Sequence, residues 1–166
     1  MRAAVFAMMA VAMVASSPAR SADLNGARAF VGWLYSHYPE REGAPAFDPT
    51  GRSAGVVFDP SMVALLREDA RHTPKGDVGA IDGDLICDCQ DDDGLTAKLG
   101  SLSAVGSRGA AAIVDLRFAK ESPPETRRLG IDLVIVRGHW RIHDIETKET
   151  PSLRMLLIQS NRSSRR

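Results

Sequence analysis

The chain has 166 residues, a length that suits a single domain, and its 21 basic and 21 acidic side chains leave it with no net charge. Hydrophobic residues make up 44% and charged residues 25% of the chain, as in an ordinary globular domain. The balanced charge gives no general electrostatic basis for nucleic-acid binding, which depends on clustered lysine and arginine. The short basic segments at 127–128 and 162–166 lack interleaved aromatic residues, so we expect them to be solvated.

The first 21 residues have the layout of a secretory signal peptide. Arg2 precedes an apolar run from Ala3 to Ala15, and small residues follow around Ala19 and Ser21. The run is too short to cross a hydrocarbon core of roughly 30 Å as a helix, so we expect no stable membrane anchor. Cleavage after Ala19 or Ser21 would release a slightly acidic protein into the periplasm or the medium.

Two helices are predicted at the start of the mature chain. In residues 24–38, apolar side chains recur at three- and four-residue steps, which predicts a helix with one buried face that ends before Pro39. In residues 59–72, Asp59 is positioned as the N-cap and Pro60 as the first helical residue. The segments rich in glycine, proline or aspartate are predicted to be loops and cover residues 40–57 and 73–94.

After Gly94 the hydrophobic period changes to two, which predicts strands. The four predicted strands are Leu95–Val105, Ala110–Ala119, Arg127–Arg137 and His139–Lys148. Their short connections carry turn residues, as in an antiparallel meander. On the last strand, Trp140 and Ile142 are expected to face the core together, against residues 30–34 of the first helix.

A short helix is expected near Pro151, followed by a frayed basic tail at 161–166. Helices first and a meander afterwards predict an α+β fold, in which N-terminal helices pack on a curved antiparallel four-stranded meander. The single domain is expected to cover residues 22–160.

Four short motifs resemble a known family. They are "YSHYP" (35–39), "LICDCQD" (85–91), "HWRIHDI" (139–145) and "SLRMLL" (152–157). Their order resembles the bacterial secreted proteins grouped as domain of unknown function 3828, and the strand from His139 looks like the closing strand of nuclear transport factor 2-like cone domains. The resemblance implies a cone with a pocket between helix and sheet. It implies no reaction, because the family name assigns none.

The aspartate-rich segment 82–94 does not match a metal site. If Gly94 takes the sixth position of a calcium loop, Cys89 takes the first and Gly100 the twelfth, where a glutamate belongs. A structural zinc site needs four ligands, and no second pair of cysteine or histidine lies near Cys87 and Cys89. We therefore expect neither a metal nor another cofactor.

Cys87 and Cys89 are separated by one residue, and several readings remain open. The C-x-C spacing lacks the context of a thioredoxin-like redox motif. On an extended chain their Cα atoms would lie near the upper limit for a disulfide, so a local bridge is one possibility. Two buried thiols, an intermolecular bridge or a catalytic thiol pair are the others. The structural readings are preferred, and a local bridge would order the loop before the first strand.

Acid–base catalysis would need an aspartate or histidine and a tyrosine that converge on a substrate. The possible pocket residues are Tyr35, Tyr38, Asp115, Trp140 and Asp144, and the histidines considered with them are His37, His139 and His143. Each also has a structural interpretation: Asp144 as a partner of Arg141 or as part of a backbone turn, for example, and His143 as a solvent-facing residue. No catalytic residue is assigned.

The sequence therefore favours a non-enzymatic periplasmic domain that binds an unknown protein or small molecule, such as an inhibitor or immunity-type protein. The alternative is a small hydrolase or isomerase that uses a pocket in the cone. A filled cone with an exposed acidic loop at 77–93 would favour the binding domain. A deep apolar pocket with Asp115 or Asp144 beside a tyrosine would favour the enzyme.

Overall fold

The computed structural model describes residues 22–36, 48–90, 94–120 and 122–165. The elements in chain order are α1 (Leu24–Ser36), α2 (Ala54–Val57), α3 (Pro60–His72), β1 (Leu95–Val105), β2 (Gly109–Phe118), β3 (Glu125–Val136), β4 (His139–Glu146) and α4 (Leu153–Ser163). The predicted signal peptide, together with His37, Tyr38 and Pro39, lies outside the described residues.

The four strands form one antiparallel sheet in the order β1-β2-β3-β4. This confirms the predicted α+β class and the four-stranded meander. Alternation on β2 is complete from Ala110 to Phe118, where every second side chain is buried. On β3, Leu129, Ile131 and Leu133 are buried, while Asp132 between them is exposed, as the sequence pattern predicted.

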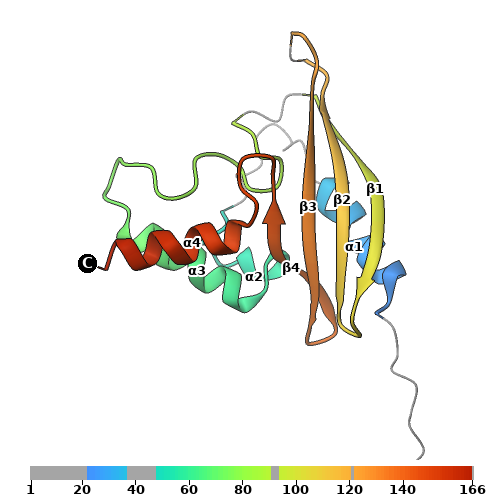
Figure 1. The fold of residues 1–166 in the computed structure, drawn as a ribbon, viewed down its shortest axis with the longest axis horizontal. Coiled ribbons are helices and arrows are strands. Elements are labelled where there is room, and N and C mark those ends of the chain that lie inside the picture. The colour runs from blue at the N-terminus through green and yellow to red at the C-terminus, as the bar shows by residue number, and fades with distance from the viewer. Residues whose placement is uncertain (1–21, 37–47, 91–93, 121, 166) are drawn as a thin grey trace, which may run out of the picture.

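The helices form two groups, one at β4 and one at β1. Figure 1 shows α2, α3 and α4 grouped beside β4, whereas α1 lies behind β1 and β2. The core lies between these helices and one face of the sheet. Its largest fully buried side chains are Phe58, Met62, Leu66, Ile86, Cys87, Val114, Leu116, Phe118, Leu129, Ile131, Ile142 and Leu157.

The predicted cap of α3 is confirmed. The Asp59 side chain accepts hydrogen bonds from the backbone N–H of Ser61 at 2.6 Å and of Met62 at 3.0 Å, and Pro60 occupies the first turn. The backbone N–H of Asp59 donates to the carbonyl of Ile142 at 2.9 Å, which ties the start of α3 to β4. The cap therefore fixes both the helix and its place on the sheet.

The expected loop at 40–57 was wrong for its last residues, which form α2. Ala54 and Val57 are buried against β4 and α3, and the backbone N–H of Phe58 closes the turn on the carbonyl of Ala54. One helical turn is too short to show a hydrophobic period, so packing rather than pattern decides it.

The prediction that residues 161–166 fray was also wrong at its start. The helix α4 continues to Ser163, and Asn161 is only 3% exposed because its amide donates to the carbonyl of Leu65 at 3.1 Å. Beyond the helix, Arg165 forms an ion pair with Glu68 of α3. Polar composition suggested a solvated end, but these contacts attach it to α3.

Trp140 and Ile142 face the core together, as predicted, with exposed fractions of 7% and 0%. A side chain at Gly26 of α1 would lie 2.9 Å from the Trp140 indole nitrogen, so Trp140 packs directly under this glycine. Ile145 is also buried, although it lies three residues after Ile142. Strict alternation forbids this spacing. The register with β3 shifts there, and a β-bulge places His143 outside the regular pairing.

Candidate functional site

The structure separates the predicted pocket residues. Tyr35 is buried, and its hydroxyl donates to the carbonyl of Ile86 at 2.9 Å. Burial, with a smaller contribution from the Asp84 carboxylate, raises the pKa of Tyr35 beyond its usual range. Tyr35 lines a groove of about 460 Å³ between α1 and β1, and the described residues that line this groove include no acidic residue. Its hydroxyl holds the loop at Ile86 in place and is not poised for proton transfer.

The other predicted pocket residues lie elsewhere. Asp115 accepts a hydrogen bond from Arg128 at 2.7 Å on the opposite face of the sheet. Asp144 caps α4: its carboxylate accepts from the backbone N–H of Arg154 at 2.9 Å and from the Ser152 hydroxyl at 2.5 Å. Of the two interpretations of Asp144, the pair with Arg141 is therefore wrong, and bonding to nearby backbone is what the structure has: Asp144 also accepts from the backbone N–H of Ile145 at 2.9 Å. Arg141 instead donates to the carbonyls of Gly55 and Trp140.

One polar cluster was missed by the sequence reasoning, and we call Asp59, Ser61, His143 and Arg154 the Asp59 cluster. Asp59 is 4% exposed, and its outer oxygen lies 2.7 Å from Nδ1 of His143 and 2.8 Å from a guanidinium nitrogen of Arg154. The same guanidinium group donates to the Ser61 hydroxyl at 2.9 Å. His143 is exposed, as expected, but its ring also contacts Asp59, a contact that the sequence did not indicate.

The Asp59 cluster is built as a structural clamp. A nucleophile triad would place the serine hydroxyl on the histidine, but here Ser61 bonds to Asp59 at 2.6 Å. Burial raises the pKa of Asp59, yet the hydrogen bonds of Ser61, Met62 and His143 and the nearby Arg154 guanidinium outweigh it and hold the pKa below its usual value. An ionised, fully engaged Asp59 joins α3, β4 and α4.

The cysteine-containing loop is ordered by its own contacts. Cys87 and Cys89 form a disulfide with their Cα atoms 5.1 Å apart, which is the local bridge among the readings that the sequence left open. Both cysteines are buried. The backbone N–H of Asp84 donates to the carbonyl of Cys89 at 2.8 Å, and Asp88 between the cysteines has a φ of 52°. The loop therefore projects Asp88 away from the core.

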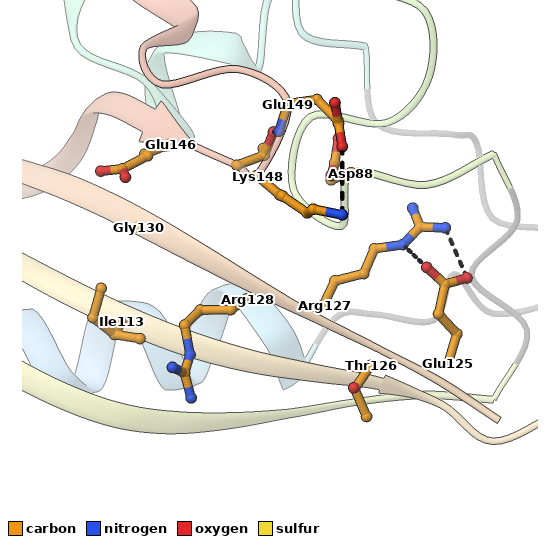
Figure 2. A pocket seen from close by; sticks show the side chains of 11 residues that line it. Asp88, Ile113, Glu125, Thr126, Arg127, Arg128, Gly130, Glu146, Lys148 and Glu149 are labelled. Atoms are coloured by element: carbon orange, nitrogen blue, oxygen red, sulfur yellow. Dashed lines mark hydrogen bonds and ion pairs between the residues drawn. The ribbon is translucent and has the colours of Figure 1, made fainter.

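Asp88 projects toward a cleft of about 780 Å³, which we call the β3 cleft. Figure 2 shows Asp88 and Lys148 on one side of this space and the Arg127–Glu125 pair on the other. The side chains that line the β3 cleft are those of Asp88, Ile113, Glu125, Thr126, Arg127, Arg128, Glu146, Thr147, Lys148 and Glu149, with Gly130 between them.

The β3 cleft exists because β3 is longer than β4. The last residue of β4, Glu146, pairs with Gly130, and the chain then turns away through residues 147–150. Residues 125–129 of β3 pair with β2 but extend past the end of β4. The disulfide loop and the 147–150 turn form the far wall. Two predicted strands of nearly equal length could not reveal this difference.

Most basic groups of the β3 cleft are matched by acids. Arg127 forms a two-bond pair with Glu125, at 2.7 and 3.1 Å, and Arg128 pairs with Asp115. Among the described residues, Asp88 and Glu146 have no hydrogen-bond or ion-pair partner for their carboxylates. Burial raises the pKa of Asp88; Arg127 opposes this rise, and Glu149 and Glu125 add to it. The unmatched charge in the cleft is therefore negative.

The described residues form neither a metal site nor a membrane-spanning helix. Within residues 22–36, 48–90, 94–120 and 122–165, no three histidine, cysteine, aspartate or glutamate side chains are grouped so that they could hold a metal ion. None of the helices described there combines the length and the apolar character needed to cross a bilayer.

Comparison with known proteins gives one informative similarity. The chain is 30% identical over 112 residues to a protein of Escherichia coli strain K12 that carries the name "Uncharacterized protein YqhG". The matched region is 68% of this chain but 35% of that protein, so the chain spans about a third of its relative's length. No family model matches the chain, and no solved structure matches it. The similarity therefore identifies a relative without assigning an activity.

Proposed function

We propose that this chain is an exported, non-catalytic binding domain that recognises a protein partner through the β3 cleft. The observation that supports this most is the cleft itself: an open site that includes Asp88, whose carboxylate has no partner among the described residues and whose loop is closed by a disulfide. By contrast, the candidate acid–base groups Tyr35 and Asp144 are engaged in structural hydrogen bonds, and they lie on different elements. The β3 cleft, formed by the end of β3 and the loops beside it, is therefore the binding surface in this proposal.

In this proposal the fold belongs to the nuclear transport factor 2-like cones, within the secreted group named domain of unknown function 3828. The motifs around the disulfide loop and β4 support this membership. A signal-peptide layout and a disulfide both suit an oxidising compartment outside the cytoplasm. Within that compartment, the role we propose is that of an inhibitor or immunity-type protein, which binds an enzyme delivered there. The fold alone does not decide the role, because one fold serves many functions.

Affinity capture tests the proposal. The mature chain is immobilised and incubated with periplasmic extract of the producing bacterium, and retained proteins are identified by mass spectrometry. We expect a retained protein that is lost when Asp88→Asn and Lys148→Glu are combined, because these changes remove or reverse charges at the cleft wall. Lys75→Glu, a reversal on an exposed loop residue outside the cleft, should retain it.

The combined variant must first show the unfolding midpoint of the natural protein. Asparagine is chosen at position 88 because it tolerates the positive φ found there. If the retained protein binds the natural chain, the combined variant and Lys75→Glu equally, then the β3 cleft is not its binding site. Retention of nothing beyond what an unrelated exported protein retains would overturn the binding role.

A further inference from the structure

The edge of β3 in the cleft carries backbone groups whose direction can be derived. The backbone N–H of Ile135 donates to the carbonyl of Arg108 at 2.9 Å, so Ile135 directs its backbone groups toward β2. The register between β2 and β3 is unbroken from Gly109 to Phe118, and directions alternate along a strand. Thr126 and Arg128 therefore direct their N–H and C=O groups away from β2, toward the position that a continuation of β4 beyond Glu146 would occupy.

These four groups remain available in the described part of the chain. Gly130, the next residue that faces this way, is already paired with Glu146 of β4. Neither Thr126 nor Arg128 has a backbone partner on this side among the described residues. Two donors and two acceptors thus lie in a row at the spacing of a β-ladder, inside a cleft and next to the end of a strand.

The other free edge of the sheet is less suited to pairing. The strand β1 has Lys98 near its centre, and its register with β2 shifts between Leu99 and Ser101. Charged residues and bulges are features by which edge strands resist the addition of another strand. Charge does not distinguish the two edges, because β3 carries Arg127 and Arg128, but the bulge does. The regular pairing of β3 with β2 contains no such shift. The two edges therefore differ in whether they accept an added strand.

Resting on the proposed function, we propose that an extended segment of the partner protein adds to β3 at Thr126 and Arg128, in line with β4, and places a lysine or arginine side chain against Asp88. Strand addition of this kind draws its affinity from main-chain hydrogen bonds and its specificity from alternate side chains. The basic side chain would form the direct ion pair that the Asp88 carboxylate does not form with any described residue. The disulfide between the residues on either side of Asp88 constrains the backbone that carries this carboxylate.

A peptide selection tests this mode of binding. Random dodecapeptides displayed on phage are panned against the folded, oxidised chain, and enriched sequences are synthesised. We expect peptides with alternating apolar residues and at least one lysine or arginine. Backbone N-methylation at alternate positions in one frame should weaken binding by about tenfold or more, while methylation in the other frame should change it little, since only every second peptide N–H faces β3.

Protein variants give the reciprocal evidence. Thr126→Pro removes an outward N–H but keeps the hydrogen bonds between β3 and β2. It should therefore weaken binding of the same peptides by about tenfold or more. Ala97→Pro is the matched control on β1. The carbonyl of Gly94 accepts from the N–H of Ala119, and directions alternate along the strand, so Ala97 directs its N–H away from β2, toward the outer edge of β1. Ala97→Pro should leave peptide binding unchanged. Asp88→Asn should weaken the binding of peptides that contain lysine or arginine.

The outcomes separate the two proposals. No enriched peptide, or peptides indifferent to both Thr126→Pro and N-methylation, would overturn strand addition. A captured periplasmic protein that is lost with the combined cleft variant yet retained by Thr126→Pro would also overturn it, while the binding function would stand. Frame-dependent peptide binding without any captured protein would support strand addition and overturn the proposed physiological role.

Discussion

Asp59 shows how one residue can determine the arrangement of three elements. As an N-cap it was evident from "DPSM", because aspartate followed by proline is typical of a helix start. Its second oxygen, however, binds His143 and Arg154, which lie more than 80 positions away in the chain. A β-bulge brings His143 there, and the sequence marks that bulge only by the three-residue step from Ile142 to Ile145, which does not show what His143 contacts. The cap was therefore predictable, whereas the cluster depended on tertiary structure.

The charge of Asp59 should stabilise the fold in a defined pH range. A carboxylate whose folded pKa is lowered contributes stability above its unfolded pKa of about 3.9, and that contribution is lost as the pH falls through the lower folded pKa. Asp59→Asn keeps a capping side chain but removes the charge. We expect a loss of roughly 1.5–3 kcal/mol at neutral pH. In urea unfolding, the difference from the natural protein should narrow below about pH 4; a constant difference would contradict this account.

Trp140 gives the corresponding test of the apolar core. It is 7% exposed and lies against Gly26 of α1, so Trp140→Ala should leave a cavity between helix and sheet. The expected loss is roughly 3–5 kcal/mol in the free energy of unfolding. Trp33, on the same helix as Gly26, is 41% exposed and stacks on Phe30, so Trp33→Ala should cost no more than about 1.5 kcal/mol. Equal denaturation midpoints for the two variants would show that the packing of Trp140 is misassigned.

At the scale of elements, the sequence predicted the ends of all four strands to within two residues. The predicted first strand, Leu95–Val105, agrees with β1 at both ends, and the other strands differ by one or two residues. The β3 cleft could not be foreseen, because it depends on β3 beginning two residues earlier and β4 ending two residues earlier than predicted. Such shifts are within the usual uncertainty of strand ends, yet together they expose the edge at Thr126 and Arg128.

The disulfide loop should behave as a local element. A bridge between Cys87 and Cys89 closes so short a segment that it hardly restricts the unfolded chain. Replacement of both cysteines by alanine, which buries no unpaired hydroxyl, should keep the fold and change global stability only slightly. Amide hydrogen exchange should quicken in residues 77–90 and remain unchanged in β2 and β3. Loss of cooperative unfolding in the double variant would show that the bridge supports the whole domain.

At the scale of the molecule, the helices leave one end of the sheet open. The helices α2, α3 and α4 pack beside β4 and its bulge, and α1 packs on the same core face of the sheet, behind β1 and β2 (Figure 1). The end of β3 beside the disulfide loop is covered by no helix of the described chain. Binding at this end would require no movement of the core, because the Asp59 cluster and Trp140 lie in the packed part of the domain.

Export and the disulfide should depend on each other. The bridge between Cys87 and Cys89 requires an oxidising compartment, and the predicted signal peptide would deliver the chain to one. When the full chain is expressed with its leader, the intact mass should match a chain that starts at Arg20 or Ala22, less the mass of two hydrogen atoms. Denatured, unreduced protein should then show nearly no free thiol. The same chain started at Ala22 with only an initiator methionine and made in the cytoplasm should be isolated with two free thiols. A full-length chain retained in the membrane fraction, or an exported chain with both thiols free, would contradict this pairing of export and oxidation.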